Sequence, residues 1–242
     1  MEKIFLETKE KLVEKVYELE NLKRREYYAQ YKYFILFHDY IVDQTKLQYE
    51  NKNMLDSIKA KRENVEFNLQ EKEIELENKL IGFENNCKIA KQVLGIYDKY
   101  TKEDIEKLDE NYKEFVSKYH PAINVKSSQE QVQLYQALTS IYLVGEVKEF
   151  ESMYITAKDR LSELVIEEDM EKILETYNLS LNNITPLIEK RKGSLPFKYE
   201  EIVDNEYNIT NEISKFRQNI YTLKEMNKNI KLDYELNFNE QI

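Results

Sequence analysis

Glycine and proline are scarce in this 242-residue sequence, which contains four glycines and three prolines. Strands and tight turns need more of these residues than this, whereas helix interiors exclude both. Charged side chains make up 34% of the chain and apolar ones 41%, a balance typical of amphipathic helices with large solvated faces. The composition therefore predicts an all-α protein.

Cysteine occurs once, at Cys87, and tryptophan is absent. A single cysteine excludes an intramolecular disulfide and a cysteine metal cluster, so we expect Cys87 to pack as a small apolar residue on a helix. The sequence also lacks a glycine-rich phosphate loop, and its carboxylates alternate with lysines as they do on solvated surfaces. These absences predict no catalytic residue, no metal site and no cofactor, and hence a protein that is not an enzyme.

A long hydrophobic run is missing as well. The richest apolar stretch, residues 31–42, is interrupted by Lys32, His38 and Asp39 and is shorter than the ~20 residues that a membrane-spanning helix needs. The first residues lead into a charged helix without the apolar stretch of a secretory signal. The net charge of −10 offers no broad basic field for phosphates. We therefore expect a cytoplasmic protein that binds neither membranes nor nucleic acid.

The absence of breakers is most complete over residues 1–81, which contain neither glycine nor proline and are expected to be helical. An apolar stripe of Phe5, Leu12, Val16 and Leu19 begins this segment, and Glu20 and Arg24 are expected to form an ion pair on its outer face. A long helix is stable only when its apolar stripe packs against another helix.

The fold we predict is a long antiparallel helical or coiled-coil stalk that carries a small helical module. The predicted parts are an N-terminal arm over residues 1–87, a compact module over 88–157, and C-terminal helices over 158–242 that pack back along the arm. An antiparallel return of these helices would cover the arm, and pairing of two arms in a homodimer is the alternative.

Aromatic side chains gather on all faces of the segment from residue 26 to residue 40. Tyr27, Tyr31, Phe34 and His38 form a candidate interaction surface on this segment. The alternative is that the segment simply packs against the C-terminal helices. A packed or hydrogen-bonded role for His38 is expected in preference to catalysis or metal binding.

The central segment carries two helix-start signals and one stop. Thr101 and Asp104 form a predicted capping box, and the run from Ser127 to Gln131 contains a second one. Pro121 disfavours helical geometry at His120, so the first of the two helices is expected to end there. Apolar residues follow the second start signal at helical spacing: Val132, Leu134, Tyr135, Leu138, Ile141, Tyr142 and Leu143.

With the sequence Tyr119-His120-Pro121 between those helices, residues 88–157 resemble a J domain, the helical module by which co-chaperones of the DnaJ type engage heat-shock ATPase chaperones. The resemblance implies that these residues face inward: Leu108, Tyr112, Phe115, Val116, Tyr119, Leu134, Leu138, Ile141, Tyr142, Val144, Phe150 and Tyr154. It implies a protein partner, either such a chaperone or a substitute for it. It also implies a partner-binding site around the turn, comprising His120, Pro121, Ala122, Lys113 and Lys118.

Two departures from the family pattern bear on function. The family's aspartate, which accepts a hydrogen bond from a chaperone arginine, is replaced by Ala122, and losing such a bond typically costs ~1.5–3 kcal/mol. The family's second helix is usually basic, whereas residues 101–119 carry four lysines and six carboxylates, a net charge of −2. We therefore expect a scaffold or adaptor that does not stimulate a heat-shock ATPase in the usual way. The alternative is a purely structural coiled-coil protein unrelated to J domains.

Overall fold

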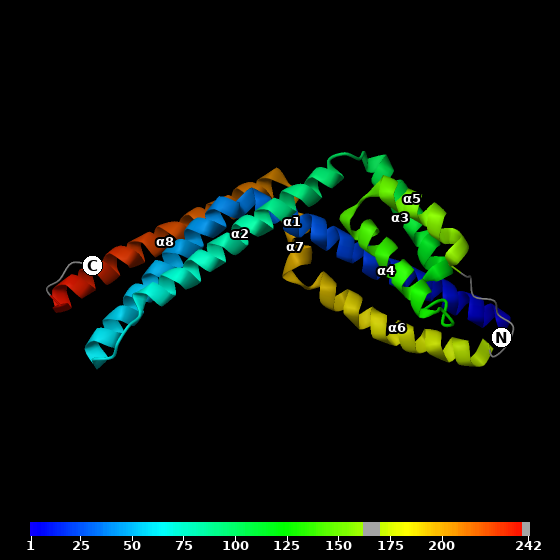
Figure 1. Ribbon diagram of the computed structural model, residues 1–242, viewed down its shortest axis with the longest axis horizontal. Coiled ribbons are helices and arrows are strands. Elements are labelled where there is room, and N and C mark those ends of the chain that lie inside the picture. The colour runs from blue at the N-terminus through cyan, green and yellow to red at the C-terminus, as the bar shows by residue number, and fades with distance from the viewer. Residues whose placement is uncertain (162–169, 239–242) are drawn as a thin grey trace. The chain divides into compact units, whose positions relative to one another are not determined.

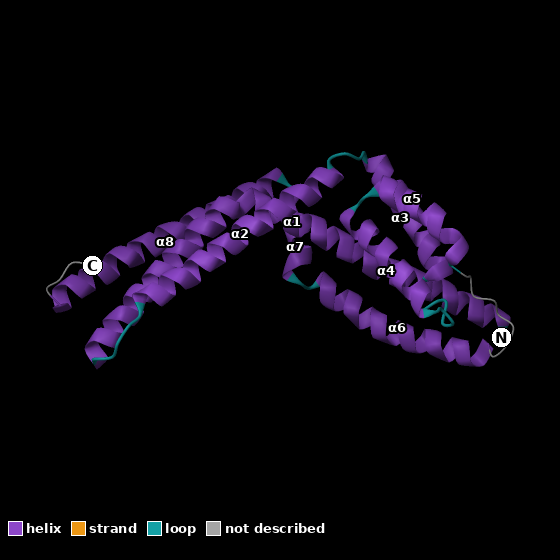
Figure 2. Cartoon of the chain, viewed as in Figure 1, coloured by secondary structure: helices purple, strands orange, loops and turns teal. Residues whose placement is uncertain are grey.

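The computed structural model describes residues 1–161 and 170–238, and within these ranges the chain forms helices and no strands (Figure 2). The all-α class predicted from the composition is therefore confirmed. The elements are α1 (Glu2–Glu63), α2 (Leu69–Tyr97), α3 (Lys102–Tyr119), α4 (Gln129–Val144), α5 (Val147–Ala157), η1 (Lys158–Arg160), α6 (Met170–Lys192), α7 (Leu195–Val203) and α8 (Glu206–Phe238).

The described chain divides into two compact units. Unit 1 comprises Met1–Tyr31 and Gln92–Glu200, and unit 2 comprises Lys32–Lys91 and Glu201–Ile242. These limits differ from the predicted boundaries after residues 87 and 157. The reason is that α1 and α2 are each shared between the two units, with one part of the helix in unit 1 and the other in unit 2. Of the C-terminal region predicted as 158–242, residues 162–169 and 239–242 lie outside the described residues.

Unit 1 is built around one apolar core shared by the first half of α1, the helices α3 to α5, and α6 (Figure 1). The predicted stripe of α1 faces this core: Phe5, Leu12 and Val16 are buried. Contacts between Phe5 and Tyr177 and between Leu22 and Ile188 show that α6 runs parallel to α1.

Unit 2 consists mainly of the second half of α1, α2 and α8, which lie side by side (Figure 1). α1 and α2 form an antiparallel pair, as contacts of Phe34 with Phe83 and of Lys79 with Tyr49 show. α8 runs parallel to α1, with Phe37 against Phe216 near one end and Lys61 against Tyr234 near the other. The expected antiparallel return of the C-terminal helices is therefore wrong, because α2 already supplies the antiparallel partner.

The turn between α1 and α2 contains no glycine and was not predicted. α1 ends in a Schellman motif in which Asn64 adopts a left-handed conformation, with φ 58°, and Val65 N donates to Ala60 O over 2.9 Å. Asparagine tolerates this conformation better than other residues with a side chain. Asn68 then accepts a hydrogen bond from Glu71 N and starts α2. Two asparagines thus end one helix and start the next, and Gly82 and Gly95 lie inside α2.

The interior of unit 2 contains polar side chains on α1. Asn51 is 2% exposed and its Nδ2 donates to Leu223 O over 2.9 Å. Asn51 lies seven residues before Ile58 and fourteen after Phe37, both of which are buried in unit 2. A buried amide at a seven-residue spacing favours one register of the neighbouring helix over others.

None of the helices in the described ranges combines the length and the hydrophobicity that crossing a lipid bilayer requires.

Candidate functional site

The site named from the sequence lies at the turn between α3 and α4 in unit 1. α3 begins with the predicted capping box, in which Thr101 N donates to Asp104 Oδ2 over 2.9 Å and Asp104 N donates to Thr101 Oγ1 over 3.2 Å. Ser128 and Gln131 form the same reciprocal pair at the start of α4. α3 ends at His120, which has φ −63° and ψ 133°. Both predicted starts and the predicted stop are confirmed.

α3 and α4 are antiparallel, and aromatic rings join them at successive levels. Tyr112 stacks on Tyr142 with centroids 3.6 Å apart, and nearer the turn Phe115 stacks on Tyr135 at 4.9 Å. Phe150 of the shorter helix α5 contacts both Tyr112 and Phe115 edge-on at 5.9 Å. Of the residues predicted to face inward, these are buried: Leu108, Tyr112, Phe115, Val116, Tyr119, Leu138, Tyr142 and Phe150.

His120 is turned into the module. Its Nδ1 accepts a hydrogen bond from Ala122 N over 3.0 Å, and its ring meets Tyr135 edge-on with centroids 5.0 Å apart. Burial, aided by the positive charge of Lys23, lowers the pKa of His120 from 6.5 to about 4. The imidazole is therefore neutral at pH 7 and serves as the acceptor that holds the turn.

This pKa predicts a pH dependence of stability. The folded protein binds the imidazole proton less tightly than the unfolded chain, so the contribution of neutral His120 is present above pH 6.5 and is lost as the pH falls toward 4. At about 1.4 kcal/mol per pKa unit, the free energy of unfolding should fall by about 3 kcal/mol from this group. His120→Asn keeps an acceptor near Nδ1 and cannot titrate, so its unfolding free energy, measured by urea titration from pH 7 to pH 4, should fall less than that of the wild type. Equal slopes for the two proteins would show that His120 is not buried as described.

The rest of the turn is anchored on α6. Pro121 and Ala122 are half-buried, and the following Ile123 is 1% exposed. The hydroxyl of Tyr177 in α6 donates to Ile123 O over 2.8 Å. The turn is therefore held from inside unit 1 by α6 as well as by His120.

The two lysines predicted to contact a partner are paired within the chain. Lys113 Nζ lies 2.6 Å from Glu14 Oε1 of α1 and 5.7 Å from the ring centroid of Tyr17. Lys118 Nζ lies 2.8 Å from Glu114 Oε1, one helical turn away on α3. Lys113 therefore joins α3 to α1, antiparallel to it, while Lys118 pairs within its own helix.

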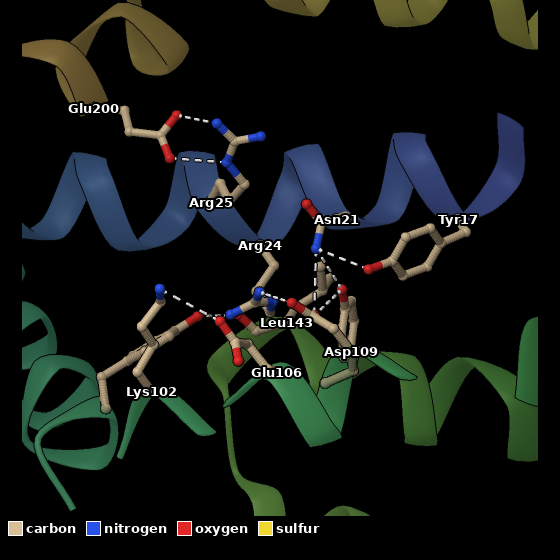
Figure 3. Close-up of polar contacts among 11 residues, drawn as sticks. Tyr17, Asn21, Arg24, Arg25, Lys102, Glu106, Asp109, Leu143 and Glu200 are labelled. Atoms are coloured by element: carbon tan, nitrogen blue, oxygen red, sulfur yellow. Dashed lines mark hydrogen bonds and ion pairs between the residues drawn. The ribbon is translucent and has the colours of Figure 1, made fainter. Parts of the chain in front are cut away.

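A buried polar cluster that was not predicted joins α1 to the same helices (Figure 3). Asp109 of α3 accepts hydrogen bonds from Arg24 Nη2 over 2.7 Å and from Tyr142 Oη over 2.8 Å. Asn21 Nδ2 donates to the same carboxylate over 3.2 Å. The side chain of Arg24 is 7% exposed and that of Asp109 is 20% exposed. The three helices α1, α3 and α4 thus meet at one ion pair.

Arg24 stays charged in this cluster. Burial opposes its charge, but the negative potential of Asp109 and the Tyr142 hydroxyl more than offset that effect, so the pKa of Arg24 is raised. Its guanidinium carbon lies 5.3 Å from the ring centroid of Tyr142, which adds a cation–π contact. The expectation that Glu20 and Arg24 pair on an outer face is wrong, since both residues are buried and Arg24 binds Asp109.

A signal for this cluster exists in the sequence. Val13 and Val16 belong to the buried stripe of α1, and Glu20 and Arg24 continue it at spacings of three or four residues. Charged residues at positions of an apolar stripe indicate buried partners, although the sequence does not say which ones.

The predicted aromatic surface is divided between the units. In unit 1, Tyr27 and Tyr31 stack with centroids 6.2 Å apart, and Tyr27 is 45% exposed. In unit 2, Phe34 contacts both His38, at 5.5 Å, and Phe83, at 6.2 Å. His38 Nδ1 lies 3.1 Å from Asp39 Oδ1.

Within residues 1–161 and 170–238, no group of three or more histidine, cysteine, aspartate or glutamate side chains is placed to hold a metal ion. Cys87 is buried on α2, as predicted. Comparisons with protein-family models, with curated proteins and with solved structures find no match.

Proposed function

We propose that the chain is a non-enzymatic, cytoplasmic protein-interaction scaffold whose α3–α5 segment is a degenerate J-like module. The arrangement of this segment supports the resemblance: two capped antiparallel helices meet at the His120–Pro121 turn, and a shorter helix packs against both. A purely structural helical bundle would need neither this turn nor its capped flanks.

The proposal also says that the module does not act on a heat-shock ATPase, and one observation supports this: α1 lies along α3. In J domains the second helix, here α3, and the turn after it provide the surface that docks on an acidic chaperone surface. Glu14 of α1 pairs with Lys113, and Arg24 of α1 pairs with Asp109. The partner of Lys113 is therefore an acidic residue of the same chain, and a chaperone that bound this lysine would have to displace Glu14.

The His120–Pro121 turn also supports a module that does not stimulate the chaperone. His120 is neutral and its Nδ1 is bonded to Ala122 N, and Ala122 has no oxygen to accept a bond from a chaperone arginine. With α1 paired to Lys113, the module lacks both the charge and the acceptor that the family uses. We infer that it binds a different protein partner or presents one, instead of stimulating ATP hydrolysis.

The experiment is a steady-state ATPase assay with a heat-shock ATPase chaperone, with an authentic J domain as the positive control. We expect the wild-type chain to leave the rate unchanged. Ala122→Asp restores the missing acceptor but leaves α3 net acidic and Lys113 paired with Glu14, so this variant should also give no stimulation. Circular dichroism of the variant should match that of the wild type.

Stimulation by the wild-type chain would contradict the proposal directly. A gain of stimulation in Ala122→Asp alone would show that the occupied face and the acidic charge of α3 do not matter. A triple variant, Ala122→Asp with Glu14→Lys and Glu110→Lys, removes the α1 partner and reverses a charge on α3. It is the variant expected to bind the chaperone more tightly than Ala122→Asp does.

A further inference from the structure

The α6–α7 corner, residues 190–195, carries a sequence that the J-like module does not use (Figure 1). It reads Lys190-Arg191-Lys192-Gly193-Ser194-Leu195, with three basic residues before the serine and an apolar residue after it. Arg191 is the one arginine in the sequence that has a serine or threonine three positions further on. Arginine-directed serine/threonine kinases select their substrates by such a charge pattern, because their substrate groove is acidic. The corner therefore combines a hydroxyl with the charges that a kinase of this class recognises.

Ser194 lies at the start of α7. Its carbonyl oxygen accepts a hydrogen bond from Lys198 N over 3.3 Å, and its hydroxyl donates to Arg191 O over 2.6 Å. Ser194 is half-buried, whereas Lys192 and Gly193 are exposed. The end of a helix opens at a much lower free energy than its interior, and α6 ends at Lys192. Unwinding of this last turn presents the basic residues and the hydroxyl together as an extended segment.

Contacts with α1 hold the corner in its closed state. Arg191 Nη1 pairs with Glu26 Oε2, and the hydroxyl oxygen of Ser194 lies 3.4 Å from Glu26 Oε1. Lys192 Nζ lies 2.8 Å from Glu18 Oε1. Glu26 is only 8% exposed. Its two carboxylate oxygens thus contact the two residues that matter most to the kinase, the arginine and the serine.

We propose that Ser194 is a phosphorylation site for an arginine-directed serine/threonine kinase, and that its phosphate releases the α6–α7 corner from α1. In the transfer, Ser194 Oγ attacks the γ-phosphorus of ATP and forms an O–P bond, while the bond from that phosphorus to the β–γ bridging oxygen breaks. ADP leaves with the bridging oxygen, and the hydroxyl proton passes to a carboxylate of the kinase. The proposal does not depend on the J-like module.

A phosphate on Ser194 competes with Glu26 for the same cation. It carries a charge of about −1.5 to −2 at pH 7 and three acceptor oxygens, which a guanidinium can bind through two parallel hydrogen bonds. The N-terminal end of α7 also favours the anion. Once Arg191 turns to the phosphate, the nearly buried carboxylate of Glu26 is left beside a like charge without its cation. The contact between α1 and the corner therefore opens.

The first test treats the full-length protein with ATP and the catalytic subunit of the cyclic-AMP-dependent protein kinase, and maps the phosphate by mass spectrometry. Ser194 should be the main site, and Ser194→Ala should lose most of the incorporated phosphate. Arg191→Ala should lower the rate at least about tenfold, whereas Arg217→Ala, an exposed arginine of α8, is the control and should leave it unchanged. No incorporation, phosphate mainly at another residue, or equal rates in the two arginine variants would overturn the proposal.

Glu26→Gln tests whether α1 restrains the corner. The variant removes the ion pair with Arg191, so the corner should open more readily and Ser194 should be phosphorylated about three- to tenfold faster than in the wild type. Glu7→Gln, at an exposed position near the start of α1, is the matched control and should not change the rate. Equal rates in Glu26→Gln and Glu7→Gln would contradict the restraint.

Hydrogen exchange tests the release itself. In the phosphorylated wild-type protein, the amides of residues 191–198 should exchange about tenfold faster than in the unmodified protein. This gain should be smaller in Glu26→Gln, which has no carboxylate for the phosphate to repel. Exchange that is unchanged or slower after phosphorylation would show that the phosphate does not release the corner from α1.

Discussion

Replacing Asp109 with alanine should lower the stability of unit 1 by about 3–5 kcal/mol, because it leaves the guanidinium of Arg24 buried without its carboxylate. The side chain of Arg24 is only 7% exposed, so water cannot take over the role of Asp109. The loss should be visible as faster hydrogen exchange of the amides of α3 and α4, which reports local opening within unit 1.

The control for this change is on the same helix. Lys102 and Glu106 of α3 form an ion pair at 3.4 Å, with side chains 86% and 61% exposed (Figure 3). Glu106→Ala should change the opening free energy by less than about 1 kcal/mol, because solvent screens exposed pairs. If Asp109→Ala were as mild as Glu106→Ala, the buried cluster would not hold α1 against α3.

Phe115→Ala should have an effect of similar size, about 3–5 kcal/mol, for a different reason. Phe115 is fully buried, stacks on Tyr135 at 4.9 Å and meets Tyr154 edge-on at 5.4 Å. Its removal leaves a cavity where α3, α4 and α5 join, and it removes the aromatic contacts at the same time. The same hydrogen-exchange measurement should show the loss across all three helices.

Ile155→Ala provides the comparison, since Ile155 lies on α5 and is 74% exposed. A surface truncation of this kind should change stability by no more than about 0.5 kcal/mol. A mild effect of Phe115→Ala would mean that α3, α4 and α5 do not share the core described here, and the J-like arrangement would lose its support.

Local signals predicted the central segment well. Thr101, Ser128 and Pro121 act through hydrogen bonds and backbone geometry within a few residues, so their effects can be read directly from the sequence. Tyr112 and Phe115, two of the inward positions that the resemblance implied, are buried.

The end of α1 was not predicted, although its cause is also local. Asn64 takes a left-handed conformation that glycine usually adopts, and Asn68 caps α2. A search for glycine and proline overlooks both residues. Gly82 and Gly95 lie inside α2, because a helix stabilised by packing tolerates a residue of low propensity.

Partners distant in sequence could not be predicted. Arg24 and Asp109 are 85 residues apart, and Lys113 and Glu14 belong to different helices. Asp109, Lys113 and Glu14 each resemble a solvated surface charge when only their neighbours in the sequence are considered, and the position of Arg24 on an apolar stripe does not identify its partner. The pairing depends on α1 lying along α3, which helical periodicity does not specify.

This pairing changes the interpretation of the candidate site. Lys113 and Lys118 were predicted to contact a partner, yet in the chain they pair with Glu14 and Glu114. His120 holds the turn through Ala122 N. The residues that resemble a chaperone-binding site therefore have structural partners inside unit 1, and this underlies the proposal of a scaffold without ATPase stimulation.

The docking of α1 on α3 is tested most directly by a double-mutant cycle on Arg24 and Asp109, with Arg24→Met, Asp109→Leu and the double variant compared by the opening free energy of α3. We expect each single variant to lose about 3 kcal/mol and the double variant to recover much of that loss, giving a coupling energy of at least about 2 kcal/mol. Losses that add to within about 0.5 kcal/mol would show that the two residues do not interact, and that α1 is not docked on α3 through this ion pair.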